Sequence, residues 1–371
     1  MFDEGVTLVS WSNASMFVDD KRITGGSERQ MRYIADALIY EGIPVKILTS
    51  NVFSKLECSD SELSLESVWS HQDFELNRIV SVVRAIYRSH RFIYLRGLSK
   101  ANMFTSLLGW LFGKKITVGM TSDLQCVKSQ NLWTNIVRKL QLLFSDNILT
   151  QTYQQREMLI EHFSCESAVV FKVINPHRFG GNVKSLDFEQ KDIDVIWIGN
   201  FDPRKSMDIY LTLSNSLVGL NFGVIGGTHP DHVEYGEIIV KEISESRNLI
   251  HFGHVNPDEI GKYLSRSKIL VSTSQPSGEG VSKEGFPNVF LEAWYFGVPV
   301  VSLYSNPSGL LDSNELGVLC SDQHHAIQII EQLTEDQNLW RKMVSNSREF
   351  SSKRDITNST TRKMLIKEIF S

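Results

Sequence analysis

The sequence predicts an α/β protein made of two doubly wound, Rossmann-like domains. Its 371 residues correspond to roughly two domains at about 150 residues each. Short apolar, β-branched runs alternate with helical stretches, and this alternation occurs twice. The two series flank Gly180–Asp192, which has two glycines, several charges and no periodicity. Alternation of strand and helix predicts parallel sheets with helices on both faces.

The first series opens with a strand at Val6–Trp11. A helix should follow from Ser27, where Ser27 and Gln30 have the spacing of a capping box. It should end near Glu41, because Gly42 favours a helix C-terminus and Pro44 cannot continue the helix. The further strands expected in this series are Val45–Leu48, Phe92–Leu95, Ile116–Val118, Asn147–Leu149 and Val169–Val173.

The second series predicts strands at Val195–Ile198, Phe222–Ile225, Leu249–Phe252, Ile269–Ser272, Val300–Leu303 and Val318–Leu319. We therefore expect an N-terminal domain over residues 1–178 and a C-terminal domain over 179–354. An amphipathic helix within 355–371 can pack on either domain, and so can rejoin the first. A cleft at the carboxyl ends of both sets of strands is the expected ligand site.

Composition narrows the class of protein. The formal net charge of −5 argues against a bulk nucleic-acid binder. No apolar run approaches the roughly 20 residues that span a bilayer, and the acidic opening Met1–Glu4 is unlike a signal peptide. Four widely separated cysteines in a chain of this size indicate a reduced, cytoplasmic protein.

The segment Lys283–Trp294 carries the most chemical information. Pro287 suits a first helical turn, so a helix should begin there and end before Gly297 and Pro299. Backbone N–H groups of Phe286 and Asn288 at a helix N-terminus form a site for phosphate. A carboxylate deeper in the helix, Glu292, can accept two hydrogen bonds from a cis-diol such as ribose. The alternative is that Glu284 is a helix-start charge and Glu292 a paired helix residue.

The two glutamates in Glu-Gly-Phe-Pro-Asn-Val-x-x-Glu-Ala resemble the signature of the retaining GT-B glycosyltransferases of family four. Other segments of the chain are similar to further motifs of this family: Gly25–Glu28, Ile198–Lys205, Phe252–Val255 and Gly297–Val301. The resemblance covers the C-terminal domain and the start of the N-terminal domain. It implies the GT-B fold, in which two Rossmann-like domains face each other across a cleft.

The resemblance also implies roles for individual residues. Glu292 would bind the ribose hydroxyls of the donor, and Glu284 a hydroxyl of the transferred sugar. Lys205 would neutralise the diphosphate leaving group, so that no tightly held metal is required. Gly26 would let its loop approach the diphosphate. The implied donor-binding set is Gly26, Asn200, Arg204, Lys205, Glu284, Gly285, Phe286, Pro287, Asn288 and Glu292.

Two positions depart from the family pattern. Asn200 stands where the family usually has an arginine, and Arg204 can replace that arginine only if its side chain points the right way. The family's histidine near the end of an N-domain strand is missing from Gly119–Asp123. Asp123 either takes its place, as a third catalytic residue beside Lys205 and Glu284, or caps a helix. Arg96 also ends a strand on the ligand side and could reach acceptor or phosphate.

The function expected from the resemblance is transfer of a sugar, with retention, from a UDP- or GDP-sugar to a glycan or lipid-linked acceptor, in surface polysaccharide or glycoconjugate synthesis. A catalytically silent, nucleotide-sugar-binding subunit is the alternative. A sugar-nucleotide epimerase is a third possibility, which the spacing of the two glutamates disfavours.

A basic and apolar stretch in the N-terminal domain suggests that this domain makes peripheral contact with a membrane, at its inner face. Arginines and a histidine cluster between Leu76 and Phe92, and an apolar group that includes Leu108, Trp110 and Leu111 follows. These residues would suit a lipid-linked acceptor at an anionic leaflet. The alternative is a buried helix of the sheet beside a solvated arginine face.

Overall fold

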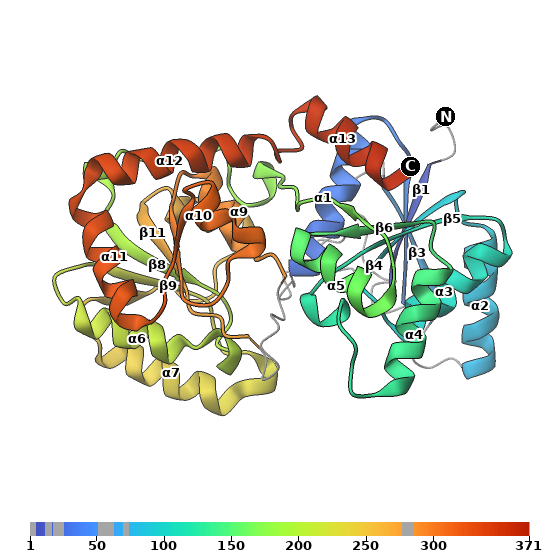
Figure 1. The fold of residues 1–371 in the computed structure, drawn as a ribbon, viewed down its shortest axis with the longest axis horizontal. Helices are drawn as coiled ribbons and strands as arrows, with labels where there is room; N and C mark the ends of the chain where they lie inside the picture. Colours follow the sequence, from blue (N-terminus) through green and yellow to red (C-terminus); the bar gives the residue numbers. More distant parts are fainter. Residues whose placement is uncertain are drawn as a thin grey trace. The chain divides into compact units, whose positions relative to one another are not determined.

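Two parallel β-sheets, one in each of two units, form the framework of the computed structural model (Figure 1). The structure describes residues 5–11, 17, 26–50, 63–69, 74–276 and 285–370. Unit 1 comprises Met1–Val173, Lys283–Phe286 and Ile356–Ser371, and unit 2 comprises Ile174–Ser282 and Pro287–Asp355.

Unit 1 contains a sheet in the order β3-β2-β1-β4-β5-β6-β7, with every neighbouring pair parallel. Its strands are β1 Val6–Ser10, β2 Val45–Ser50, β3 Leu63–Trp69, β4 Phe92–Arg96, β5 Lys115–Gly119, β6 Asn147–Thr150 and β7 Ala168–Val169. Its helices are α1 Gly26–Tyr40, α2 Glu75–Tyr87, α3 Lys100–Leu111, the short 3-10 helix Asp123–Gln125, α4 Leu132–Leu143, α5 Tyr153–Phe163 and α13 Ser359–Phe370.

Both faces of this sheet are covered by helices, as the βαβ pattern predicts. Successive strand residues enter different cores: Leu8 packs with α1 and α13, whereas Val9 packs with residues of α2, α3 and α4. This division follows from the period of two along a strand and from right-handed crossovers, which change face where the strand order reverses after β3.

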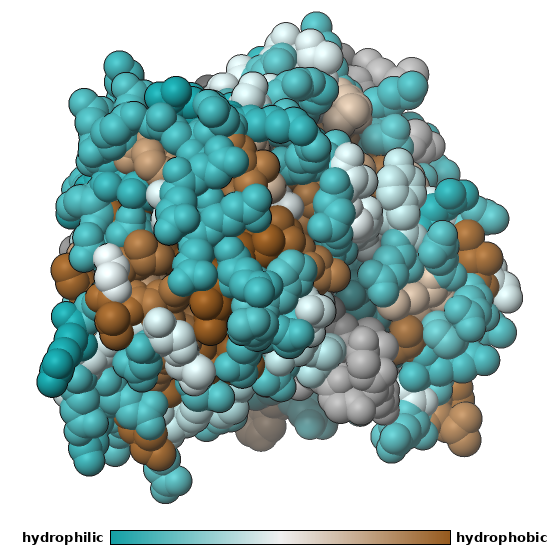
Figure 2. All heavy atoms as spheres, turned by 60° about the vertical axis from the view of Figure 1, so that its left-hand side comes forward, coloured by the Kyte–Doolittle hydropathy of each residue, from teal (hydrophilic) through white to brown (hydrophobic). Residues whose placement is uncertain are grey.

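Unit 2 contains a second parallel sheet in the order β10-β9-β8-β11-β12-β13. Its strands are β8 Ile193–Ile198, β9 Phe222–Ile225, β10 Leu249–His251, β11 Ser267–Ser272, β12 Val300–Ser302 and β13 Gly317–Leu319. Its α-helices are α6 Met207–Ser216, α7 Val233–Glu245, α8 Ile260–Leu264, α9 Asn288–Tyr295, α10 Leu310–Ser313, α11 Gln323–Glu335 and α12 Gln337–Ser352. Figure 2 shows a face of the molecule on which hydrophilic side chains predominate and hydrophobic ones gather in patches.

The predicted α/β class with two parallel sheets is confirmed, and most predicted strands lie within two residues of their observed bounds. Strand β3 was missed, because its sequence Leu-Ser-Leu-Glu-Ser-Val-Trp mixes polar with apolar residues at the edge of the sheet. The strand predicted at Val169–Val173 is shorter: β7 ends at Val169. The Gln30 amide of the predicted capping box donates to the Val173 carbonyl, at 2.8 Å.

The segment Gly180–Asp192, predicted as a linker, is tied to unit 2. The N–H of Leu186 donates to the Ser265 carbonyl at 3.2 Å, and the Ser185 hydroxyl donates to the Phe296 carbonyl at 2.8 Å. Lys191 is buried in the same segment and donates to the Ser265 carbonyl. Irregular backbone can therefore be well anchored when its polar groups find partners.

The C-terminal helix α13 belongs to unit 1. The Thr117 hydroxyl of β5 donates to the Ile369 carbonyl at 2.6 Å, and Arg362 pairs with Glu41 at 2.6 Å. Ile356, Leu365 and Ile366 enter the core that α1 shares with the sheet. No helix in the described part of the chain is both long and apolar enough to cross a membrane.

Candidate functional site

The carboxyl end of β8 in unit 2 presents the predicted phosphate-binding loop. After Ile198, the chain passes Gly199 and half-buried Asn200 and forms a single 3-10 turn, Pro203–Lys205. At the end of β9, Gly226 has a φ of +147°, and a Cβ there would lie 1.7 Å from the Gly199 carbonyl oxygen. Only glycine permits this close approach of two loops at the edge where open α/β sheets bind ligands.

A buried hydrogen-bond relay anchors the Lys205 backbone. Trp197 Nε1 donates to the Thr273 hydroxyl at 3.1 Å, and this hydroxyl donates to the Lys205 carbonyl at 2.6 Å. The Gln275 N–H donates to the Arg204 carbonyl at 2.8 Å. The loop after β8 is therefore held to the segment that follows β11, which fixes where the Lys205 side chain starts.

The Arg204 side chain forms an ion pair with Asp202. Its guanidinium makes a bidentate ion pair with the Asp202 carboxylate, with Nε at 2.8 Å from Oδ1. Burial alone would raise the pKa of Asp202, but the hydrogen bonds and charge of Arg204, with the charge of His232, outweigh it and lower the pKa to about 2. Arg204 thus braces the 3-10 turn in this structure.

Helix α9 presents its N-terminus near the same edge of unit 2, after β11. Pro287 is the N-cap residue and Asn288 the first helical residue, so the helix begins one residue later than predicted. Phe286 is fully buried, and Glu292 is only 1% exposed although it carries a carboxyl group. Burial of a carboxylate is costly unless its environment supplies donors, so an ordinary solvated helix position is excluded for Glu292.

Gly285 lies with unit 1, beside polar side chains that follow β5 and β6. It has a φ of +40°, and a Cβ there would lie 2.3 Å from Gln155 Nε2 and 3.1 Å from Asp123 Oδ1. Gln155 Nε2 donates to Asp123 at 2.9 Å. Burial raises the pKa of Asp123, and the hydrogen bond from Gln155 opposes this rise. Asp123 is the first residue of a 3-10 helix, whose N-cap residue is Ser122 and not Asp123.

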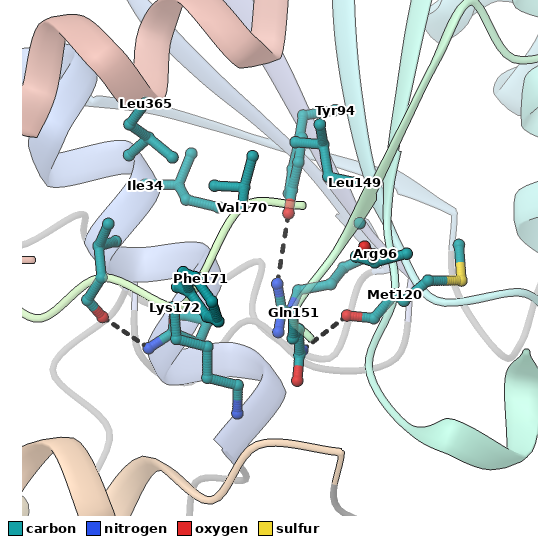
Figure 3. A pocket seen from close by; sticks show the side chains of 14 residues that line it. Ile34, Tyr94, Arg96, Met120, Leu149, Gln151, Val170, Phe171, Lys172 and Leu365 are labelled. Carbon is teal, nitrogen blue, oxygen red and sulfur yellow. Dashed lines mark hydrogen bonds between the residues drawn. The ribbon is translucent and has the colours of Figure 1, made fainter. Parts of the chain in front are cut away.

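A small open hollow lies at the carboxyl ends of the strands in unit 1. Figure 3 shows apolar Ile34 and Leu365 at one end of it and Gln151 and Lys172 at the other. Arg96 donates to Ser27 at the start of α1, at 3.2 Å, and to the Tyr94 hydroxyl at 3.3 Å. The described residues that line the hollow include Arg96 and Lys172 but no carboxylate, so the hollow suits an anionic group.

Gln151 adds a polar group to this hollow. It is 3% exposed, and its Nε2 donates to the Met120 carbonyl at 2.6 Å. Its Oε1 is buried and has no hydrogen-bond partner within the described part of the chain. A ligand hydroxyl is the kind of donor that would satisfy it.

The structure thus places the predicted residues in two groups. Asn200, Arg204, Lys205, Pro287, Asn288 and Glu292 lie in unit 2, and Gly26, Asp123, Gly285 and Phe286 lie in unit 1. Gly26 is the exposed first residue of α1 rather than part of a loop. Glu284 and Gly25 lie outside the described residues.

Sequence reasoning missed Thr273, Gln151 and Lys172. Each of the three lies directly after the carboxyl end of a strand or a few residues beyond it. A polar residue at such a position is the signal that could have identified them. The signal is weak, because many polar residues end strands and only the contacts distinguish these three.

Comparison with known proteins was made at three levels. Residues 181–350 match the family model described as "Glycosyl transferases group 1". No curated protein matches the chain at a significant level. Among solved structures, sucrose-phosphate synthase from Thermosynechococcus elongatus is similar with a TM-score of 0.73 and 16% identity, over 99% of each chain.

Two further structures are similar over nearly the whole chain. Anabaena HepE in complex with UDP has a TM-score of 0.74 and 14% identity, over 98% of each chain. A glycosyltransferase from Rickettsia africae has a TM-score of 0.74 and 15% identity, over 100% of each chain. At these identities the structural likeness establishes the fold. The chain therefore has the GT-B fold, and the match over residues 181–350 supports a glycosyltransferase.

Proposed function

We propose that the protein is a retaining glycosyltransferase of family four that transfers a sugar from a UDP- or GDP-sugar to a hydroxyl of a glycan or lipid-linked acceptor. The observation that carries this proposal is the burial of Glu292 in α9, in a domain that matches the group 1 family. A buried carboxylate that can bind a ribose diol explains why a charge is kept among Leu291, Ala293 and Trp294.

Lys205 is proposed to stabilise the leaving diphosphate. Its backbone is held by Thr273, so the ammonium group can be positioned where negative charge develops as the glycosidic bond breaks. Glu284 is proposed to hold the transferred sugar, with backbone groups of Gly285, Phe286 and Asn288. The donor bound by Anabaena HepE, UDP-glucose, illustrates the class of ligand.

The acceptor is proposed to occupy the hollow of unit 1. Arg96 and Lys172 would hold an anionic group, such as the phosphate of a lipid-linked acceptor, and Gln151 Oε1 would accept a hydrogen bond from a hydroxyl. Asp123, whose pKa is raised by burial, is proposed to act on the sugar or on the acceptor hydroxyl from the same unit. This acceptor chemistry favours a role in surface polysaccharide or glycoconjugate synthesis.

The test is a thermal-shift panel of UDP- and GDP-sugars, followed by kinetics with the donor that binds. A donor at 100 times its Kd should add about 2.7 kcal/mol to stability. Glu292→Gln should lower kcat/KM by an amount equivalent to roughly 1.5–3 kcal/mol, the scale of a charged hydrogen bond. Glu331→Gln, which changes an exposed glutamate of α11, is the matched control and should leave kcat/KM unchanged.

A silent, nucleotide-sugar-binding subunit is the second candidate, favoured by Asn200 and by the commitment of Arg204 to Asp202. Donor binding with neither hydrolysis nor transfer would establish it. A product whose anomeric configuration is inverted by NMR would reject the retaining assignment. Absence of binding by every donor would reject both candidates.

A further inference from the structure

The region between Phe74 and Ser145 is strongly basic within an acidic protein. It contains eleven Lys and Arg residues and two Asp and Glu residues, a formal charge of +9, whereas the whole chain carries −5. One of the two acids, Asp123, is buried, so Glu75 is the exposed one. A local charge of this size creates a positive surface whatever the sign of the whole molecule.

The same region exposes large apolar side chains on the outer faces of α2 and α4. On α4, Leu132 is 78% exposed and Trp133 60%, and Ile136 and Leu143 continue the stripe at helical spacing. On α2 and just before it, the exposed apolar residues are Phe74, Leu76, Ile79, Val80 and Tyr87. A soluble surface rarely gathers so many exposed apolar groups without a partner.

Helix α3 connects these two faces. Its C-terminal residues Trp110 and Leu111 are exposed, whereas Leu108 is buried against the sheet, so the apolar group seen in the sequence is divided between core and surface. The Trp110 ring lies 5.4 Å from that of Phe144, after α4, and the Tyr87 ring of α2 lies 5.4 Å from that of Phe112, after α3. Aromatic contacts thus hold the ends of the three helices together, and the helices lie side by side in unit 1 (Figure 1).

The same helices and the segments next to them carry exposed cations. They are Arg84, Arg88, Arg91, Lys100, Lys128 and Lys139. Trp and Leu side chains flanked by Lys and Arg are the composition of a helix that lies in the interface of an anionic bilayer, because the apolar groups enter the acyl boundary and the cations meet the headgroups.

Unit 2 provides a contrast that argues for specificity. Helix α7 also exposes apolar side chains, among them Ile238 at 56%. Its other residues include Glu234, Glu237, Glu242 and Glu245, and only one lysine. An anionic surface would repel this helix, so apolar exposure and positive charge coincide on unit 1 and not on α7.

We propose that α2, α3 and α4 form a surface by which unit 1 docks on an anionic lipid bilayer. The α2 and α4 N-termini, with Leu76, Leu132 and Trp133, follow the carboxyl ends of strands, the edge at which the hollow of unit 1 lies. The proposal concerns lipid binding alone and does not depend on donor turnover.

The experiment is co-sedimentation of the full chain with vesicles of phosphatidylcholine alone or mixed with an equal part of phosphatidylglycerol. We expect binding to the anionic vesicles only, with loss of binding between ~0.1 and ~1 M salt, where the Debye length falls from about 10 to about 3 Å. Lys128→Ser with Lys139→Ser should weaken binding roughly 10- to 30-fold, at about 1 kcal/mol for each cation. Leu132→Ser with Trp133→Ser should weaken it on the order of tenfold or more.

Ile238→Ser is the matched control and should bind as the unchanged protein does. Circular dichroism should report the same fold for every variant, because all substituted side chains are exposed. Equal binding by the α4 variants and the parent, or no binding to anionic vesicles, would overturn the proposal. A parent dimer that Leu132→Ser with Trp133→Ser makes monomeric, without vesicle binding, would assign this surface to a second copy instead.

Discussion

The relay from Trp197 through Thr273 to Lys205 makes Thr273→Val an informative perturbation. Valine has nearly the shape of threonine but no hydroxyl, so the change removes both hydrogen bonds at a fully buried position. The indole N–H of Trp197 and the carbonyl of Lys205 would then lack this partner. Each orphaned buried group costs about 1–3 kcal/mol, so the two together should cost unit 2 roughly 2–6 kcal/mol of stability.

The same change should affect catalysis through position. The loop after β8 loses one of its two anchors to the segment after β11, and a displacement of about 1 Å at a catalytic group costs on the order of 10²-fold in rate. We expect kcat to fall far more than KM rises, because Lys205 is proposed to act on charge that develops in the transition state.

The measurements are the midpoint of urea unfolding and steady-state kinetics of the full chain. Thr273→Ser keeps the hydroxyl and should restore most of the stability and of kcat. If Thr273→Val matches Thr273→Ser in both quantities, the relay does not position Lys205. If stability falls but kcat stays unchanged, the relay is structural only.

Two further predictions concern stability. Burial, and the nearby charge of Arg348, lower the pKa of Lys191 from 10.5 to about 7. Between these two pH values the unfolded chain binds one more proton at Lys191 than the folded chain does. The free energy of unfolding should therefore rise with pH from about 7 to about 10.5, by on the order of 4–5 kcal/mol. Lys191→Met should abolish this rise in the urea midpoint, and parallel pH curves for the variant and the parent would contradict the prediction. Gly285→Ala should destabilise unit 1 by roughly 1–3 kcal/mol, because the positive φ of Gly285 is combined with a clash between the new Cβ and Gln155. Gly113 has a φ of +66° and open space around it, so Gly113→Ala should destabilise the protein less. Equal losses of stability in the two variants would contradict the clash.

Periodicity predicted the fold well, because a parallel sheet needs continuous apolar strands between helices and these leave a strong pattern. The exceptions share a physical cause. Strand β3 lies at a sheet edge and mixes polar with apolar residues, and the segment Gly180–Asp192 is ordered by hydrogen bonds to distant residues such as Ser265. Contacts of this kind leave no local signal.

The candidate site was predictable only in part. Pro287 and Glu292 belong to a dense motif, and their helix was expected nearly at its observed bounds. The sequence could not show that the Arg204 guanidinium pairs with the Asp202 carboxylate, because that ion pair depends on the shape of one 3-10 turn. It could not show Gln151 and Lys172 on one hollow either, because strand order brings them together.

The return of α13 to unit 1 has a consequence for how the protein is made. The core beneath α1 includes Ile356, Leu365 and Ile366, which are separated from Val173 by all of unit 2. At a synthesis rate of about 5–20 residues per second, the intervening segment of about 180 residues takes roughly 10–35 s to emerge. During that interval the nascent unit 1 keeps an uncovered apolar face. This is the period in which binding by a chaperone would protect it most from aggregation.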